Sequence, residues 1–281
     1  MILKEIKNLF NKELSDIYTP SEIQELFFIL SEKFLGGDKI TIRRNENIDI
    51  EEFKEKKIFS ALSELKSGKP YQQILGEALF YGNTFFVDEN VLIPRPETEE
   101  LIEIIVKQLH LQKHENLKIL DIGTGSGCIP ITLAKYFPNA QITSIDISEK
   151  ALKIARKNAD FHQVKINFVQ KDYLIEKLND EYDIIVSNPP YISTSESEEI
   201  PFSVKNFEPN IALFAPQNRD LAFYEKIASD CENHLKKNGY IFLEINQKLG
   251  QETLQLFKTK FRNTQLLKDI SGNDRFVIKS K

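Results

Sequence analysis

The 281-residue sequence has few cysteines and histidines, no surplus of positive charge and no long apolar run. No segment approaches the roughly 18 uncharged apolar residues that a membrane span needs. Charged side chains interrupt the amino-terminal helix pattern over residues 1–17, which argues against a signal peptide. We therefore expect a soluble, cytoplasmic protein.

A formal net charge of -5 argues against broad electrostatic binding to nucleic acid and favours a protein or small-molecule substrate. The composition, 41% hydrophobic and 28% charged, is typical of a globular protein, and the length allows two compact domains.

The few cysteines and histidines show no metal-ligand pattern. Cys128 and Cys231 lie far apart, as expected for reduced thiols that serve packing. The four histidines lack ligand spacing and fall mostly near predicted helix ends: His110, His114, His162 and His234. We expect no metal site.

Residues 1–75 show helical patterns only. Thr19-Pro20-Ser21-Glu22 is a capping box with proline at the first helical position, and an apolar stripe follows from Ile23 to Phe34. A third stripe through Phe53, Ile58, Leu62 and Leu65 ends before Gly68. These residues predict a small helical bundle.

The pattern changes over residues 76–93, where β runs at 78–81 and 85–87 around Gly82-Asn83 predict a hairpin linker. From residue 94 to 281, helical stretches such as 150–161 and 221–236 alternate with strand candidates at 117–122, 141–147, 165–169, 183–186 and 240–245. Alternation of this kind predicts an α/β fold, a mostly parallel sheet covered on both faces. Residues 264–270 and 275–279 predict an antiparallel hairpin at its edge. The polar segment 193–199 predicts a mobile loop.

Asn188-Pro189-Pro190-Tyr191 directly follows the apolar run from Tyr182 to Ser187. Neither proline can donate a backbone hydrogen bond, so the loop offers mainly acceptors, which suits a substrate with an NH2 group. The alternative interpretation is a strand that simply ends at prolines.

A glycine-rich turn follows the first strand of the α/β region and opens a helix at Cys128. A dinucleotide-binding motif would need glycine at position 128. The Asp-x-Gly-x-Gly-x-Gly spacing instead resembles motif one of class I S-adenosyl-L-methionine-dependent methyltransferases, with candidate cofactor residues Asp121, Gly123, Thr124, Gly125, Ser126 and Gly127.

Two later strands end in further cofactor candidates. Asp146, about twenty residues on, is placed to accept both ribose hydroxyls. Asp172 and Tyr173 are placed beside the adenine, with Tyr173 supplying an aromatic face. Each feature alone also fits an ordinary turn or a solvated acid, so their order along the chain carries the prediction.

The Asn188–Tyr191 tetrad and the cofactor motif together resemble enzymes that methylate a planar nitrogen, either the exocyclic amine of adenine or cytosine or the amide of glutamine. In this interpretation Asn188 and the Pro189 carbonyl accept both N–H hydrogens, and Tyr191 packs on the flat face of the substrate. No metal takes part.

Three stretches, residues 71–77, 80–82 and 91–99, resemble the peptide chain release factor glutamine methyltransferase family. The resemblance implies a class I, Rossmann-like sheet with a helical amino-terminal domain. It also implies methylation of the glutamine amide in the Gly-Gly-Gln loop of class 1 release factors, with S-adenosyl-L-homocysteine as the second product. The family's cofactor positions map onto Gly123–Gly127, Asp146, Tyr173 and Asn188, and its substrate tetrad maps onto Asn188, Pro189, Pro190 and Tyr191.

The sequence departs from many members at two places. Tyr173 stands where they carry tryptophan or phenylalanine, and Asn218-Arg219-Asp220 lacks a glycine.

Several roles stay open. Arg95 is either a substrate-binding residue that helps close the site or a rigid joint, and Glu244 and Gln247 are either pocket-edge or structural residues. The alternatives to glutamine methylation are an adenine-N6 DNA or RNA methyltransferase and a cofactor-sensing protein without activity. The amino-terminal helices, surplus to a catalytic fold, are expected to recognise the protein substrate.

Overall fold

The computed structural model describes residues 1–110 and 116–280 of the protein, and the chain forms two compact units. The first unit contains residues 1–77 together with 202–207. The second contains residues 78–201 and the chain from 208 onward. Each unit has its own hydrophobic core.

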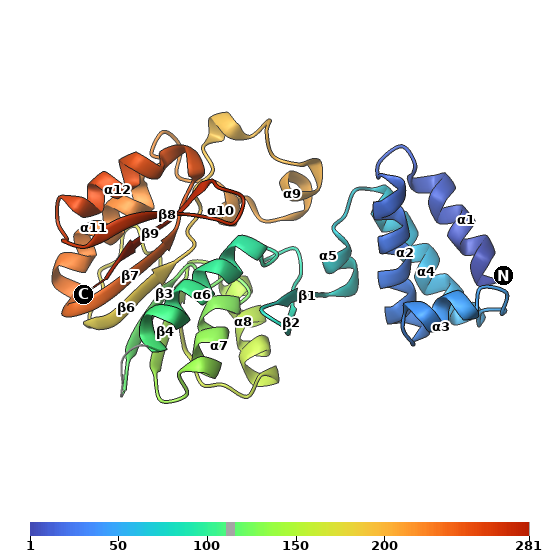
Figure 1. Ribbon diagram of the computed structural model, residues 1–281, viewed down its shortest axis with the longest axis horizontal. Coiled ribbons are helices and arrows are strands. Elements are labelled where there is room, and N and C mark those ends of the chain that lie inside the picture. The colour runs from blue at the N-terminus through green and yellow to red at the C-terminus, as the bar shows by residue number, and fades with distance from the viewer. Residues whose placement is uncertain (111–115, 281) are drawn as a thin grey trace. The chain divides into compact units, whose positions relative to one another are not determined.

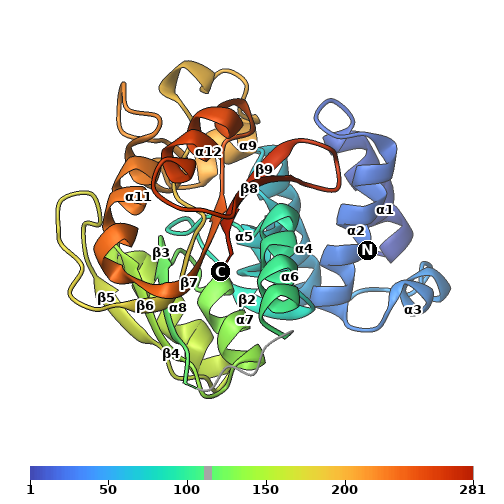
Figure 2. The ribbon, with the colours of Figure 1, turned by 60° about the vertical axis from the view of Figure 1, so that its left-hand side comes forward.

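The first unit is helical, as the apolar stripes predicted. Its elements are α1 (Leu3–Leu14), α2 (Pro20–Leu35), α3 (Lys39–Arg44), α4 (Glu52–Lys66), α5 (Tyr71–Leu75) and α9 (Phe202–Phe207). Helices α1, α2 and α4 pack side by side in both views (Figures 1 and 2). The predicted capping box is confirmed, since Thr19 N donates to Glu22 Oε2 at 2.7 Å and Glu22 N donates to Thr19 Oγ1.

Two features of this unit differ from the sequence prediction. Phe53 is 56% exposed and does not belong to the core, because it lies in the first turn of α4, ahead of the buried stripe from Ile58 to Leu65. Helix α9 joins the bundle from far along the chain: Gln73 Nε2 donates to the Phe207 carbonyl at 2.7 Å. Neither local pattern nor spacing could predict that pairing.

The predicted hairpin exists, shifted by about one residue. Strands β1 (Glu77–Phe80) and β2 (Asn83–Phe86) are joined by Tyr81 and Gly82, with φ angles of 48° and 71°. Two consecutive positive φ angles are typical of the two-residue type I′ turn, so the turn is Tyr81-Gly82 rather than Gly82-Asn83.

The second unit is built on a seven-stranded sheet in the order β5-β4-β3-β6-β7-β9-β8. The strands are β3 (Lys118–Ile122), β4 (Gln141–Asp146), β5 (Asn167–Gln170), β6 (Tyr182–Ser187), β7 (Leu235–Glu244), β8 (Thr264–Lys268) and β9 (Asp274–Lys279). The pairs from β5 to β7 are parallel, and those of β9 with β7 and β8 are antiparallel. The predicted α/β fold and its carboxy-terminal hairpin are confirmed.

Helices cover both faces of this sheet (Figure 1). One face packs against α6 (Pro96–His110), α7 (Cys128–Tyr136) and α8 (Glu149–Phe161). The other packs against α11 (Ala222–His234) and α12 (Gly250–Lys258). The predicted helix over 221–236 is wrong at its end, because the extended backbone of β7 already begins at Leu235.

The strand order creates a switch point between β3 and β6. The chain passes from β3 to β4 on one side, and later returns to β6 on the other side of β3. In the register, Ile122 lies beside both Ile145 and Ser187. The loops after β3, β4 and β6 therefore begin at one edge, where open α/β sheets bind their ligands.

The polar segment 193–199, predicted as a mobile loop, has defined structure. It forms the 3-10 turn η1 (Thr194–Glu196), and Glu196 Oε2 accepts from Asn246 Nδ2 at 2.8 Å and from Ser193 N at 2.9 Å. Ile192 pairs with Phe214, beyond the short helix α10 (Asn210–Leu213). Long-range pairing of this kind leaves no mark on local composition.

The thiols of Cys128 and Cys231 are free, and both pack among apolar side chains as predicted. His162 and His234 lie at the ends of α8 and α11, where their rings contact the carbonyls of Thr84 and Asp180, while His114 lies outside the described residues. Within residues 1–110 and 116–280, no group of three or more His, Cys, Asp or Glu side chains is arranged to hold a metal. None of the described helices combines the length and apolarity that crossing a bilayer requires.

Candidate active site

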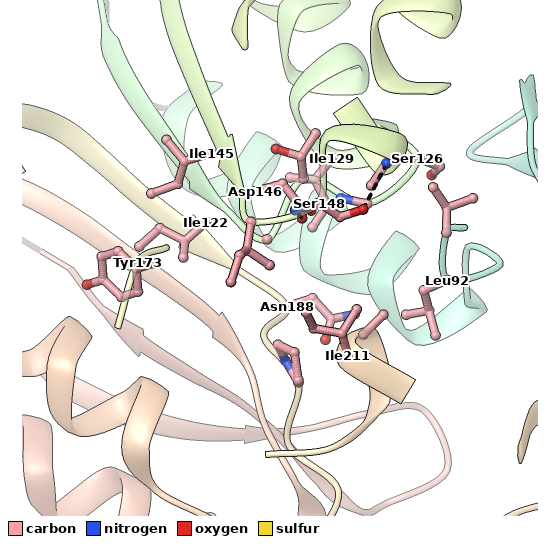
Figure 3. A pocket seen from close by; sticks show the side chains of 18 of the residues that line it. Leu92, Ile122, Ser126, Ile129, Ile145, Asp146, Ser148, Tyr173, Asn188 and Ile211 are labelled. Atoms are coloured by element: carbon pink, nitrogen blue, oxygen red, sulfur yellow. Dashed lines mark hydrogen bonds between the residues drawn. The ribbon is translucent and has the colours of Figure 1, made fainter. Parts of the chain in front are cut away.

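A cavity of about 320 Å³ lies at the switch point of the sheet. Its walls come from the loops after four strands, from residues 90–98 and from residues 211–216. Figure 3 shows Asp146, Tyr173 and Asn188 arranged around this space, together with Ile122 and Ile145. The sequence-predicted convergence of four loops on one edge is thus observed.

The glycine-rich loop forms one wall, and the carboxylate of Asp146 holds it in place. Gly125 N donates to Asp146 Oδ2 at 2.9 Å, and Ser148 N donates to Oδ1 at 2.8 Å. Gly123 and Gly125 both have positive φ, and a Cβ on Gly125 would meet nothing within 4 Å. The loop therefore exposes backbone to the cavity, at a place where a ligand can approach closely.

A buried amide that sequence reasoning missed supports this loop from behind. Asn158 in α8 donates from Nδ2 to the Ser126 carbonyl at 2.8 Å and to the Phe86 carbonyl at 2.9 Å. Its Oδ1 accepts from Phe86 N at 2.7 Å. Asn158 thus joins the hairpin to the glycine-rich loop. A polar residue among apolar ones on a helix is the only trace of this role in the sequence.

Asp121, expected to bind cofactor, is completely buried and lies outside the cavity lining. Its Oδ2 accepts from Ser144 Oγ, and Oδ1 has no hydrogen-bond partner among the described residues. Burial raises the pKa of this carboxyl to about 7. Asp121 is the penultimate residue of β3, so its side chain stands on one face of the sheet beside Ser144 of β4 and does not reach the loop at the edge.

Asp172 and Tyr173 follow β5 and line the far end of the cavity. Tyr173 is 5% exposed, and its hydroxyl points away from the side chains of Asp146 and Asn188 (Figure 3). Lys226 Nζ lies 5.0 Å from the ring centroid. The aromatic surface thus contributes to the cavity, while the hydroxyl is turned into the protein.

Asn188 and Pro190 line the cavity beside the glycine-rich loop. The Asn188 carbonyl lies 3.6 Å from the position that a Cβ on Gly123 would take. Pro189 is buried, and Tyr191 is turned away from the cavity, where its hydroxyl donates to Glu244 Oε1 at 3.3 Å. The packing of Tyr191 against a substrate stays a prediction.

A chain of hydrogen bonds reaches the Asn188 amide from inside the protein. Asn188 Nδ2 donates to Thr98 Oγ1 at 3.1 Å, and Thr98 Oγ1 donates to Glu244 Oε2 at 2.7 Å. Thr98 and Glu244 are 2% and 1% exposed. Burial raises the pKa of Glu244 to about 7, against the hydrogen bond from Thr98 and the charge of Arg275, which lower it.

Arg95 lines the cavity and forms an ion pair with Glu208. The Glu208 side chain is fully buried, and its Oε2 also accepts from Ile93 N at 2.9 Å. Glu208 thereby links the residues just before α10 to the segment before α6 that contains Ile93 and Arg95. The pair supports the structural interpretation of Arg95, while its place in the lining keeps the substrate-binding interpretation open.

The chain matches both a protein-family model and full-length relatives. The family model for the methyltransferase small domain matches residues 102–202. A release factor glutamine methyltransferase from Flavobacterium psychrophilum is 46% identical, covering 99% of this chain and 98% of that protein. Those from Streptococcus pneumoniae and Bacteroides thetaiotaomicron are 40% and 37% identical, also over 99% of this chain and over 98% and 100% of those proteins.

The chain belongs to the release factor glutamine methyltransferase family. Solved structures agree at the level of the fold. The hMettl16 catalytic domain, in complex with MAT2A 3′UTR hairpin 1, is 14% identical with a TM-score of 0.56 over 90% of each chain. A methyltransferase from Pyrococcus furiosus is 16% identical with a TM-score of 0.50, covering 82% of this chain and 98% of that one.

The loops of the site could be predicted from the sequence of this family member, but most of the side chains that support those loops could not. Gln247 is exposed and lies outside the cavity lining, and Glu244 lies behind the site rather than at its edge. Thr98 was visible in the stretch from Val91 to Glu99, but nothing local assigned it a partner 146 residues away. Asn218 takes φ of +60°, so asparagine fills the left-handed position without a glycine.

Proposed function

We propose that this protein transfers a methyl group from S-adenosyl-L-methionine to the side-chain amide nitrogen of the glutamine in the Gly-Gly-Gln motif of class 1 release factors. The observation that carries the proposal is the placement of Asn188 beside the glycine-rich loop in one cavity. The named activity of relatives that match over nearly the whole chain supports the choice of substrate.

The cavity has the chemistry that the methyl donor requires. The glycine-rich loop offers close backbone approach, and Asp146 lies where it can accept from ribose hydroxyls. Tyr173 and the apolar side chains of Ile122, Ile145 and Leu174 form a surface for the adenine. We assign residues 123–126, Asp146, Asp172, Tyr173 and Asn188 to cofactor binding. Gly127, expected to bind cofactor, does not line the cavity and packs against Ile131 and Ala155, so we assign it, with Asp121, to support of the loop.

The reaction makes one bond and breaks one. When bound, S-adenosyl-L-methionine supplies a sulfonium methyl group. The amide nitrogen would form the new bond to the methyl carbon, the electron pair of the broken carbon–sulfur bond would leave on sulfur, and the nitrogen would release one proton to solvent. An amide lone pair is delocalised, so Asn188 Oδ1 and the Pro189 carbonyl assist by accepting both N–H hydrogens and favouring a pyramidal nitrogen. In-line positioning supplies the rest.

The remaining assignments rest on the same proposal. Release factors act where proteins are synthesised, so we assign the protein to the cytoplasm and release factors as its partners. We propose three functional parts: a helical recognition domain (1–75), a hairpin linker (76–93) and a catalytic domain (94–281). Pro190 and Arg95 line the substrate end of the cavity, and Tyr191 acts there through its contact with Glu244.

The test supplies methyl-labelled S-adenosyl-L-methionine with three substrates: an unmethylated class 1 release factor, the same factor with its Gly-Gly-Gln glutamine replaced, and mixed DNA and RNA. We expect label on the intact factor only. Asn188→Ala should lower turnover by about 100-fold or more, as when one preorganised polar contact to a transition state is lost. It should leave the dissociation constant of S-adenosyl-L-methionine within about threefold, because the glycine-rich loop, Asp146 and Tyr173 keep most of the assigned cofactor contacts. Label on nucleic acid, or full turnover by the variant, would contradict the proposal.

A further inference from the structure

The Asn188 amide has two ends that differ chemically, and only one of them suits a substrate NH2 group. Its oxygen accepts hydrogen bonds and its nitrogen donates them. A substrate amide brings two N–H donors to the loop, so a useful Asn188 must present Oδ1 to the cavity. The two prolines that follow Asn188 offer no N–H that could hold the amide oxygen in place. Something else must decide which way the amide faces.

The hydrogen-bond chain behind Asn188 has a fixed polarity. An ionised Glu244 carboxylate can only accept, so the single proton of the Thr98 hydroxyl goes to Glu244 Oε2. The Thr98 oxygen then has only lone pairs left for Asn188, and only the Nδ2 end of the amide can donate to them. The other end, Oδ1, is turned away from Thr98.

The parts of this chain are rigid and dry. Thr98 lies in the first turn of α6, with its backbone N donating to the Arg95 carbonyl at 3.1 Å, and Glu244 ends β7. Both side chains are buried, so water does not compete for the hydroxyl proton. The second carboxylate oxygen of Glu244 is engaged by Tyr191, so the tetrad is held at both of its ends.

We infer that Thr98 and Glu244 are positioning residues that orient the Asn188 side chain with its oxygen toward the substrate amide. This inference rests on the proposed glutamine methylation and adds to it the reason that Asn188 can act as an acceptor. Thr98 lines the same cavity as Asn188, so this chain of hydrogen bonds reaches the cavity in which we place the substrate amide.

The matched variants are Thr98→Val and Thr98→Ser. Valine keeps the shape of threonine but has no hydroxyl, and serine keeps the hydroxyl and loses one methyl group. We expect Thr98→Val to lower kcat for release factor methylation by about 10- to 100-fold, the range seen when the hydrogen-bond partners that orient a metal ligand are removed. The dissociation constant of S-adenosyl-L-methionine should stay within about threefold, and Thr98→Ser should retain at least about one third of the wild-type kcat.

Glu244→Gln tests the polarity itself, because a Gln amide that donates to Thr98 would send the hydroxyl proton toward Asn188. We expect a fall in kcat similar to that of Thr98→Val, and no further fall in the double variant, since both changes act through one chain. Tyr191→Phe controls for the second contact of Glu244. Circular dichroism and cofactor affinity identify a variant that fails to fold. If Thr98→Val fails, the kcat of Thr98→Ser is compared with that of Glu244→Gln instead.

The outcomes separate this inference from the proposed function. A wild-type protein that leaves release factors unlabelled refutes the function. A wild type that labels them, with Thr98→Val equal to wild type, overturns the inference alone. Equal loss in Thr98→Val and Thr98→Ser also overturns it, because packing rather than the hydroxyl would then be responsible.

Discussion

Gly125 and Gly127 belong to the same loop and both have positive φ, yet the structure predicts different consequences for an added methyl group. Gly125 has φ of +54° with open space around its missing Cβ. Gly127 has φ of +82°, and a Cβ there would lie 3.0 Å from Ile131 Cδ1 and 3.2 Å from Ala155 Cβ. The second glycine thus permits the close approach of α7 to α8, while the first faces the cavity.

The two substitutions to alanine share one set of energies. In each variant, an alanine in the left-handed backbone conformation lowers the free energy of unfolding by about 1–2 kcal/mol. The less flexible unfolded chain offsets this by about 0.4–1 kcal/mol. Gly127→Ala adds an overpacking cost of about 1–3 kcal/mol, because the contacts include the Ala155 Cα at 3.3 Å, which moves only with its helix. Gly127→Ala should therefore be less stable than Gly125→Ala by about 1–3 kcal/mol.

The assay is urea unfolding monitored by circular dichroism, because the protein has no tryptophan whose fluorescence could report unfolding. Amide hydrogen exchange in α7 and α8 assigns the loss to the second unit. Affinity for S-adenosyl-L-methionine should rank the variants in the opposite order, because Gly125 lines the cavity and Gly127 does not. Equal stabilities within about 0.5 kcal/mol, or the same ranking in both measurements, would refute the reasoning.

Two further predictions concern pH and the helical unit. The ionised Glu244 faces Arg275, Tyr191, Tyr224, Glu97 and Cys128, and burial raises its pKa to about 7. We expect kcat to fall as pH drops through about 7, and we expect this fall to be absent from the pH–kcat profile of Glu244→Gln. If the variant shows the same fall, the titrating group would instead be Asp121, whose pKa is also about 7. Unfolding does not explain the fall, because a carboxyl with a raised pKa makes the fold less stable as pH rises from about 4 to 7, and protonation removes that penalty. Deleting residues 1–75 should raise the KM for release factor at least tenfold more than the KM for S-adenosyl-L-methionine if the helices recognise the protein substrate; equal changes would indicate a structural role.

The sequence by itself determined the elements and their order. Apolar periodicity and turn residues are local signals, so the helices before residue 75, the alternation after residue 94 and the loops that carry Gly125, Asp146 and Asn188 could be predicted. The parallel sheet followed from the alternation, because parallel strands need crossover connections. Strand boundaries were less exact, as at β7, because pairing rather than propensity decides where a strand starts.

Only the tertiary structure decided which side chains support the site. Thr98 meets Glu244 across 146 residues, Arg95 meets Glu208 across 113, and Gln73 meets the carbonyl of Phe207 across 134. Such pairs depend on the packing of distant elements, and no local pattern encodes them. The same packing buries Asp121 beneath its own loop and turns Tyr191 toward Glu244, away from the cavity. The residue type determines which chemistry a side chain can perform, and the packing of distant elements determines where that side chain lies and what it contacts.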